Sequence, residues 1–214
     1  MVVLIGPPFG EPTYSETPTK RSVVLHCLGR HEEASRAIKR AQEIDPLSPV
    51  IGLNVAISSY FEGHYERALQ EMDAVIAIDS SFSPAYYRKT YSLVKLGKTQ
   101  EAYTASLKGV EISGRSPEAV SFLGYCAGLL GMRDEALKIA KELEQRYASG
   151  MSVGYFVARV YAGLGDDQES FRWLNADREN HSGSMIWLTQ DLEWDPYRSD
   201  KRFVGLLKEI GLQK

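Results

Sequence analysis

The sequence predicts an all-α protein, a right-handed α-solenoid of about five helix-turn-helix units closed by a C-terminal capping helix. Two observations predict this fold class. Glycines recur every 34 residues, and a small residue follows each glycine five positions later. The glycines are Gly29, Gly63, Gly97, Gly131 and Gly165, and the small residues are Ala34, Ala68, Ala102, Ala136 and Ser170. A fixed period of this length is typical of stacked repeats, because each unit buries its apolar face only against its neighbours.

The glycines are expected to form the turn between the two helices of each unit. Glycine adopts positive φ without a steric penalty, so two antiparallel helices can be joined in very few residues. The small residue five positions later is expected where the two helices cross, because a larger side chain would push the axes apart. The turn glycine and the small residue therefore predict how the helices pack.

The second helix of each unit is predicted from apolar residues at helical spacing, as at Ala34, Ile38, Ala41 and Ile44. The five predicted second helices span 31–44, 65–78, 99–112, 133–147 and 167–179. Pro49, Pro84 and Pro117 fall at the expected starts of first helices, where proline is tolerated. These prolines therefore mark helix starts at the positions that the 34-residue period predicts.

The two ends of the chain differ from the repeats in residues 19–184. Residues 1–18 contain four prolines and are expected to be an extended or disordered arm, either covering the first unit or remaining from a longer protein. Residues 185–214 are expected to form a cap, with a helix over 199–210 that starts at Ser199 and stops at Gly211. Its large apolar residues are predicted to cover the end of the array, and they are Trp187, Leu188, Trp194, Phe203 and Leu207.

This pattern resembles the tetratricopeptide repeat (TPR). Gly63, Tyr65 and Ala68 match the glycine, aromatic and alanine of that repeat, and Asp45 with Pro46 matches its closing signal. The sequence departs from the family pattern in lacking the tryptophan early in the first helix. It also has other residues at the position of the aromatic in four units, namely His31, Thr99, Arg133 and Asp167. The resemblance implies a protein that binds other proteins or peptides.

The end of the chain carries a second resemblance. Residues 171–174, 195–200 and 203–212 are similar to the closing segment of TPR regions attached to bacterial signalling proteins, such as winged-helix regulators, adenylyl cyclases and protein kinases. This resemblance implies a regulatory or sensory segment derived from such a protein, and it stands as the alternative to a free adaptor.

Composition argues against several classes of partner. The formal net charge is -3 at pH 7, whereas nucleic-acid-binding surfaces and membrane-surface segments are usually basic. No apolar stretch has the length of a membrane span, and residues 1–5 lack the features of a secretory signal. Cys27 and Cys126 are expected to be buried free thiols. Together these features predict a cytoplasmic protein that binds neither nucleic acid nor membrane.

The sequence shows no pattern of an active site. Its four histidines have no metal-ligand spacing with the cysteines, and His31 and His64 are expected to be solvated turn residues. Acidic pairs such as Glu32 and Glu33 fall on predicted wet faces of helices, and no glycine-rich phosphate loop is present. We therefore expect a non-catalytic scaffold without metal or cofactor.

Helical periodicity predicts a set of first-helix side chains that line a concave groove, among them five tyrosines. Tyrosine suits peptide recognition, because it offers a large contact area at little entropic cost. The same aromatics at these positions also suit packing between neighbouring helices, and this alternative is equally weighted. The candidate groove residues are Asn54, Tyr60, Tyr87, Arg88, Tyr91, Tyr125, Tyr155 and Arg159.

Some family members bind the C-terminal carboxylate of chaperones with a clamp of five polar residues. Asn54 and Arg88 match two of these five, whereas Thr19, Val23 and Pro84 stand where the others are needed. This ligand class is therefore disfavoured. Arg88 and Arg159 can still pair with acidic groups on another ligand. The partner predicted from the sequence is an unidentified protein or peptide.

Overall fold

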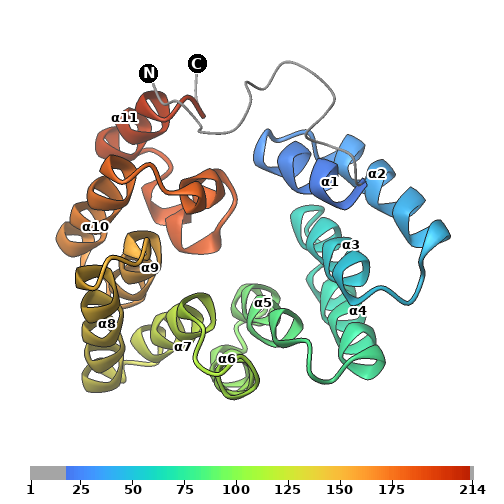
Figure 1. Ribbon diagram of the computed structural model, residues 1–214, viewed down its shortest axis with the longest axis horizontal. Helices are drawn as coiled ribbons and strands as arrows, with labels where there is room; N and C mark the ends of the chain where they lie inside the picture. The colour runs from blue at the N-terminus through green and yellow to red at the C-terminus, as the bar shows by residue number, and fades with distance from the viewer. Residues whose placement is uncertain (1–17, 213–214) are drawn as a thin grey trace. The chain divides into compact units, whose positions relative to one another are not determined.

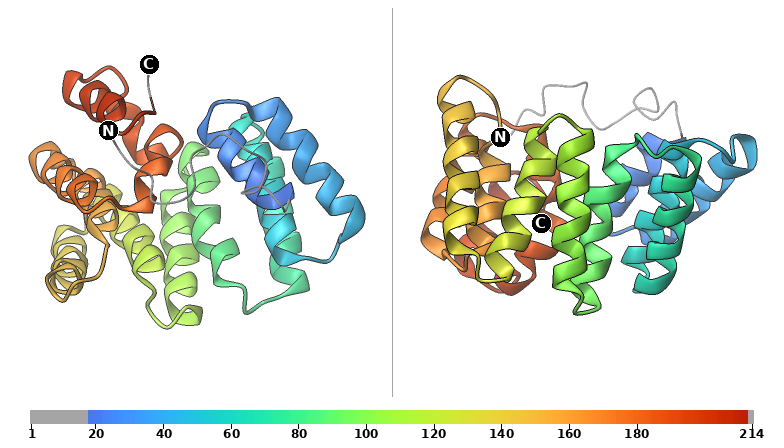
Figure 2. Two further views of the ribbon diagram at one scale, coloured as in Figure 1. Left: turned by 45° about the horizontal axis from the view of Figure 1, so that its top comes forward. Right: turned by 90° about the horizontal axis from the view of Figure 1, so that it is seen from below.

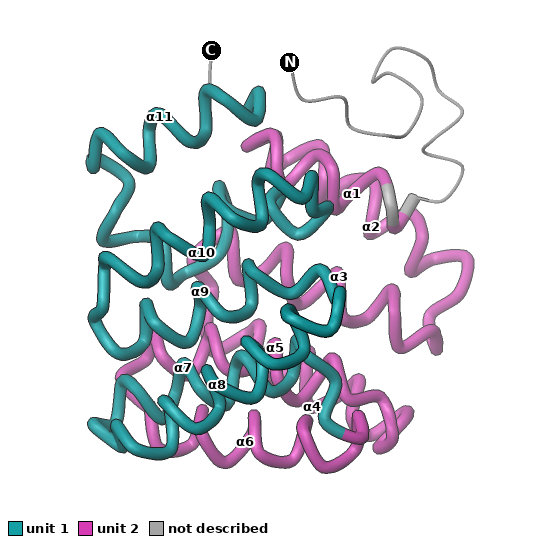
Figure 3. The backbone as a smooth tube through the Cα atoms, turned by 60° about the vertical axis from the view of Figure 1, so that its left-hand side comes forward, with its two compact units in different colours: residues 1–6, 115–214 teal, residues 7–114 magenta. Residues whose placement is uncertain are grey.

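The computed structural model describes residues 18–212, which fall into two compact units. Following Figure 3, unit 2 comprises residues 18–114 and unit 1 comprises residues 115–212. Every regular element in the described residues is helical, which confirms the all-α prediction. The arm predicted over residues 1–18 lies outside the described residues except for its last position, which begins the first helix.

Unit 2 consists of three helix pairs. Its helices are α1 (Pro18–Cys27), α2 (His31–Ile44), α3 (Pro49–Phe61), α4 (Tyr65–Ile78), α5 (Ser83–Lys95) and α6 (Thr99–Ile112). Figures 1 and 2 show the two helices of each pair running side by side. One apolar cluster joins α3, α4 and α5 through buried residues such as Leu53, Met72 and Ala85. A smaller cluster joins α2 to α3 through Ile38 and Val55.

Unit 1 contains two further helix pairs and a closing segment. Its α-helices are α7 (Pro117–Leu129), α8 (Arg133–Ala148), α9 (Gly154–Gly163), α10 (Asp167–Glu179) and α11 (Lys201–Glu209). Two 3₁₀ helices, η2 (Gly183–Thr189) and η3 (Leu192–Tyr197), separate α10 from α11. Figure 1 shows this 3₁₀ segment beside α9. Trp194 and Phe203, both predicted to belong to the cap, are fully buried.

The repeat punctuation has the role that the sequence predicts. The five turn glycines adopt φ between 69° and 80°, a region that other residues rarely enter. The five small residues that follow them are all 0 % exposed. All five predicted second helices are present, although α8 ends one residue later than predicted, at Ala148.

The residues that cap the helix N-termini agree with the sequence prediction at some helices and differ from it at the last one. Ser48 and Ser116 accept hydrogen bonds from backbone amides in the first turns of α3 and α7, ahead of the expected prolines. The prediction that Ser199 caps the last helix is wrong. Asp200 takes this role, since its carboxylate accepts from the amide of Arg202. A carboxylate at a helix N-terminus also interacts favourably with the helix dipole.

Two glycines inside unit 1 allow a close approach of α7 and α9. A methyl group added to Gly128 would lie 2.4 Å from the carbonyl carbon of Gly163, and one added to Gly163 would lie 2.5 Å from the carbonyl oxygen of Tyr125. The missing side chains at these two positions let the two backbones touch.

The two cysteines, Cys27 and Cys126, are free and buried as predicted. Among residues 18–212, no helix is both long and apolar enough to cross a membrane.

Candidate functional site

The eight candidate residues are divided between the two units. Unit 2 holds five of them on α3 and α5, namely Asn54, Tyr60, Tyr87, Arg88 and Tyr91. Unit 1 holds three on α7 and α9, namely Tyr125, Tyr155 and Arg159. Their exposure differs widely, and this decides which of them a ligand can reach.

In unit 2 the aromatic candidates form a packed cluster around Tyr60. The ring of Tyr60 lies 5.9 Å from that of Tyr91 and 5.5 Å from that of Tyr65. Tyr60 is half-buried, whereas Tyr87 and Tyr91 are only 6 % and 5 % exposed. Tyr87 also packs closely against Gly109 of α6. Tyr87 and Tyr91 therefore contribute mainly to the contacts between helices, and Tyr60 is the most accessible of the three.

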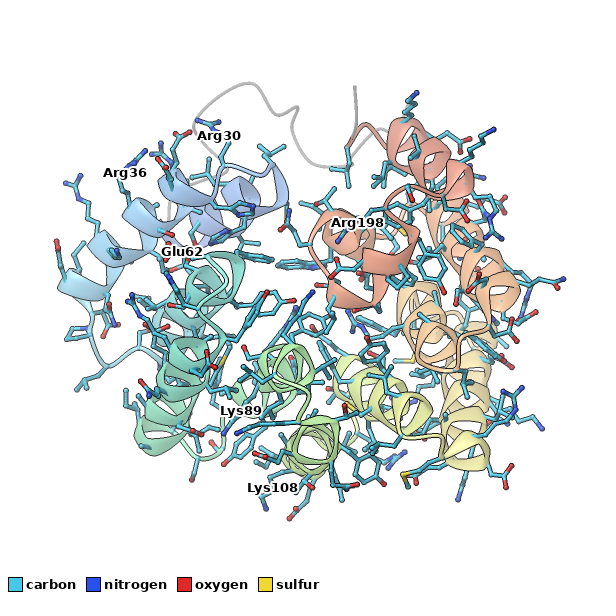
Figure 4. The ribbon with its side chains drawn as sticks, turned by 180° about the vertical axis from the view of Figure 1, so that it is seen from behind. Arg30, Arg36, Glu62, Lys89, Lys108 and Arg198 are labelled. Atoms are coloured by element: carbon cyan, nitrogen blue, oxygen red, sulfur yellow. The ribbon has the colours of Figure 1, made fainter. Side chains whose placement is uncertain are left out.

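Polar residues flank this cluster on α3 and α5. Arg88 is half-buried, and its neighbour Lys89 pairs with Asp73 of α4 at 2.5 Å (Figure 4). On α3, the side-chain amide of Asn54 donates to the carbonyl of Val50 at 2.8 Å. This bond orients the amide so that Oδ1 points away from the helix backbone. Oδ1 is buried and accepts no hydrogen bond from any described residue. A buried acceptor without a donor costs free energy, and a hydrogen bond from a ligand would remove this cost.

A histidine cluster links α1, α2 and α3 in the same unit. His26 Nε2 lies 2.8 Å from Ser58 Oγ, and His26 Nδ1 lies 3.1 Å from His31 Nδ1. Both rings pack against Phe61. The expectation that His31 is a solvated turn residue is wrong, because it is half-buried in this cluster. His64, in contrast, is exposed as expected.

The contacts of His26 suit a neutral ring. The Ser58 hydroxyl donates to the carbonyl of Asn54, so His26 Nε2 is left to donate to the hydroxyl oxygen and Nδ1 to accept from His31. A second proton on His26 would turn the short contact with His31 into two opposed donors. Burial, reinforced by the charge of His31 and partly offset by Glu62, lowers the pKa of His26 to about 4.

Unit 2 is therefore expected to lose stability in mild acid. The unfolded chain protonates this imidazole near pH 6.5 but the folded chain only near pH 4, so the contribution is complete above pH 6.5 and declines as the pH falls. Between pH 7.5 and pH 5, the free energy of unfolding should fall by about 1–2 kcal/mol from this residue alone, because one pKa unit corresponds to about 1.4 kcal/mol.

Urea unfolding followed by circular dichroism at both pH values measures this loss. The variant His26→Gln provides the comparison, because glutamine keeps a donor and an acceptor but does not titrate. Carboxylates titrate in the wild type and in the variant alike. The difference between the two losses of unfolding free energy therefore reports on His26 alone. An equal loss in the two proteins would contradict the assignment.

In unit 1 the candidate Arg159 lies at the centre of a buried polar network. Its Nε donates to Glu193 at 2.5 Å and its Nη2 donates to Asp191 at 2.5 Å. The remaining Nη1 donates to Ser121 Oγ at 2.9 Å. Both acidic residues lie in the 3₁₀ segment, so the guanidinium joins that segment to α7 and α9. All three charged side chains are almost completely buried.

Aromatic rings complete the site around this guanidinium. The Cζ atom of Arg159 lies 4.3 Å above the ring centre of Phe122 and 5.2 Å from that of Tyr155. The Tyr155 hydroxyl donates to Asp191 at 2.8 Å and accepts from the indole nitrogen of Trp194 at 2.8 Å. We call Ser121, Phe122, Tyr155 and Arg159 the Arg159 site.

The network carries two carboxylates against one guanidinium. Burial raises the pKa of Glu193, an effect that Arg159 opposes and the neighbouring Asp191 charge reinforces. Burial also raises the pKa of the Tyr155 and Tyr125 hydroxyls, and the Glu193 carboxylate adds to both effects. Both tyrosines stay protonated at neutral pH, and the Tyr155 hydroxyl acts as donor and acceptor in the network.

Tyr155 and Arg159, proposed from the sequence as groove residues, thus contact the chain's own C-terminal segment. Each is 1 % exposed, so another ligand would reach them only by displacing residues 191–194. The sequence analysis did not identify Asp191 and Glu193 as site residues. The 34-residue repeat period could have identified Glu193, because Glu193 lies 34 residues after Arg159 and equivalent positions of successive repeats face each other.

A metal centre has no support from the side chains described. Among residues 18–212, no group of three or more histidine, cysteine, aspartate or glutamate side chains is placed to hold a metal ion.

Comparisons with known proteins address the fold. No protein-family model matches the chain. A stretch of 79 residues is 35 % identical to the small glutamine-rich tetratricopeptide repeat-containing protein 2 of Mycosarcoma maydis, which covers 37 % of this chain and 22 % of that protein. The chain spans about a fifth of the length of the curated relatives it matches.

Two solved structures extend the likeness over most of the chain. TTC0263, a thermophilic TPR protein of Thermus thermophilus, matches with a TM-score of 0.63 and 20 % identity over 89 % of this chain and 97 % of that one. A chain of the APC/C hetero-tetramer Cut9-Hcn1 matches with a TM-score of 0.61 and 14 % identity, over 90 % of this chain and 42 % of that one. With the positive-φ glycines and buried small residues at a 34-residue period, these matches show that the chain has the tetratricopeptide-repeat fold.

Proposed function

We propose that the chain is a non-catalytic interaction module and that the α3 and α5 face of unit 2 binds a peptide or protein segment. The observation that carries the proposal is Asn54 Oδ1, a buried acceptor without a donor from any described residue. Asn54 is itself only 6 % exposed, so a backbone N–H of an extended ligand would reach and satisfy this oxygen only after the side chains around it move. Half-buried Tyr60 and Arg88 add aromatic contact area and a positive charge on the same two helices.

The structural neighbours support an interaction role in general terms. One of them is a chain of the Cut9-Hcn1 hetero-tetramer, so a closely similar arrangement of helices occurs in a protein complex. Helical arrays of this kind present extended surfaces that suit partner binding. The alternative, a regulatory segment derived from a larger bacterial signalling protein, rests on the sequence of residues 171–212 and stays a prediction.

The test replaces the acceptor without changing its size. A displayed peptide library is selected against the full chain, and the dissociation constant of the best peptide is measured for the wild type and for Asn54→Leu. We expect the variant to bind at least about tenfold more weakly, because the peptide N–H loses its acceptor, a difference of about 1.4 kcal/mol. Binding is followed by fluorescence anisotropy.

Asn175→Leu in α10 is a matched control. Its side-chain amide makes the same type of bond, donating to the carbonyl four residues earlier at 2.9 Å, but the residue is exposed. This variant should bind the peptide as the wild type does. The substitutions Tyr87→Ala and Tyr91→Ala are unsuitable, because both rings are buried and their loss would disturb the packing. If Asn54→Leu keeps full affinity, the α3 and α5 face is not the binding site.

A further inference from the structure

We propose that the Arg159 site of unit 1 is a second recognition site, specific for acidic segments of the pattern Asp-x-Glu-Trp. In the structure, residues 191–194 of the same chain occupy it as a tethered ligand. A partner protein with the same acidic and aromatic pattern would bind the site when the tethered copy is weakened. This inference concerns unit 1 and is independent of the peptide surface proposed in unit 2.

The helices supply the whole receptor side of this site. Arg159 and Tyr155 are four residues apart on α9 and so project from one face of the helix. Ser121 and Phe122 come from α7 and hold the guanidinium from the other side, by a hydrogen bond and by ring contact. Ser121 is itself oriented, because its hydroxyl donates to the carbonyl of Glu118. Ser121 is therefore positioned, and holds one nitrogen of Arg159, without help from residues 191–194.

The occupant supplies complementary chemistry from a short stretch of chain. Asp191 and Glu193 each bind a different nitrogen of Arg159, and Trp194 donates to the Tyr155 hydroxyl. Both carboxylates are accepted by one planar guanidinium, which offers five donors in a fixed geometry. The site therefore recognises two negatively charged residues that are separated by one residue and followed by an indole N–H.

The structure also indicates why this occupant can be exchanged. Residues 183–197 form two 3₁₀ helices, whose hydrogen bonds are poorer than those of α-helices. Arg198, which directly follows the segment, donates to the carbonyls of Leu188 and Asp191. Burial and the neighbouring Asp191 charge raise the pKa of Glu193, so keeping this carboxylate ionised reduces the stability of the closed state. Opposing this, Leu188 and Trp194 of the segment are fully buried, so release of the segment also costs these apolar contacts.

Tethering sets the competition between the two ligands. A segment joined to its site by a short linker acts at an effective concentration in the millimolar range. A free peptide of the same sequence therefore fails to compete in the wild-type chain unless the tethered copy is weakened. Neutralising Asp191 and Glu193 in the full chain weakens that copy and leaves the receptor residues unchanged.

The experiment measures binding of a fluorescein-labelled peptide with the sequence of residues 188–197. We expect the full-length variant Asp191→Asn/Glu193→Gln to bind it at least tenfold more tightly than the wild type. Adding Arg159→Gln to this variant should abolish the gain, and a peptide with asparagine and glutamine at its two acidic positions should not bind. Asp134→Asn/Glu135→Gln, an acidic pair at the start of α8, is the matched control and should behave as the wild type.

A second measurement uses the unchanged protein, so it holds even if the neutral variant fails to fold. In a hydrogen-exchange experiment, the hydrogen-bonded amide protons of Asp191 and Trp194 should exchange with solvent at least tenfold faster than the central amide protons of α7 and α9. Equal rates would show that the segment leaves only on global unfolding and would overturn the proposal. So would a folded neutral variant that gains no affinity, or a gain that survives Arg159→Gln. Asn54→Leu should change none of these results, which separates them from the unit 2 surface.

Discussion

Replacing Arg159 with methionine should lower the free energy of unfolding of unit 1 by about 3–5 kcal/mol, as when one partner of a buried ion pair is removed. Methionine fills part of the space of the arginine stem, so the loss reflects charge more than volume. Asp191 and Glu193 would stay buried next to each other and would lose the guanidinium that both of them contact. Urea unfolding monitored by circular dichroism and by tryptophan emission measures the change.

The loss should also depend on pH in a way that a packing defect would not. Without the guanidinium, the pKa of the Glu193 carboxyl, which burial already raises, rises further, and protonation of this group in mild acid relieves the repulsion. The difference between Arg159→Met and the wild type should therefore shrink from pH 7.5 to pH 5. Arg172→Met is the control, because Arg172 is an exposed partner of Glu169 and its loss should change stability by less than about 1 kcal/mol. An equally small effect at Arg159 would contradict the role assigned to it.

The second large loss of stability is expected for the variant Gly128→Ala. An alanine there would place its methyl carbon 2.4 Å from the backbone of Gly163, and the backbone cannot yield as a side chain can. α7 and α9 would have to separate, at a cost of about 1–3 kcal/mol or more. The separation would also displace Ser121 and Phe122 from Arg159, so near-ultraviolet circular dichroism should change together with the unfolding midpoint.

Gly205→Ala is the opposite case within the same unit. Gly205 lies inside α11 and a methyl group there would meet no atom within 4 Å. Alanine has the higher helix propensity, so this variant should be more stable than the wild type by about 0.5–1 kcal/mol. If both alanine variants shift stability in the same direction, the close contact between α7 and α9 is not what requires glycine at position 128.

Most of the fold was predictable because the repeat encodes it locally. Turn glycines and crossing alanines act through backbone sterics within a few residues, and this short range is why the second helices were located from spacing alone. The candidate sites were less predictable. Periodicity placed Tyr87 and Tyr91 on the face of the first helices, but it does not distinguish a ring that faces solvent from one packed between helices. The structure shows that these two rings are buried.

The all-α repeat fold, the positions of the turns and the presence of an unusual C-terminal segment follow from the amino-acid sequence. The contacts of that segment depend on how the helices pack. Asp191 and Glu193 lie 32 and 34 residues after Arg159 and meet it through the stacking of α9 against the 3₁₀ segment. Charge pairing over such separations depends on the geometry of packed elements. Local propensity, which acts over a few residues, carries no information about it.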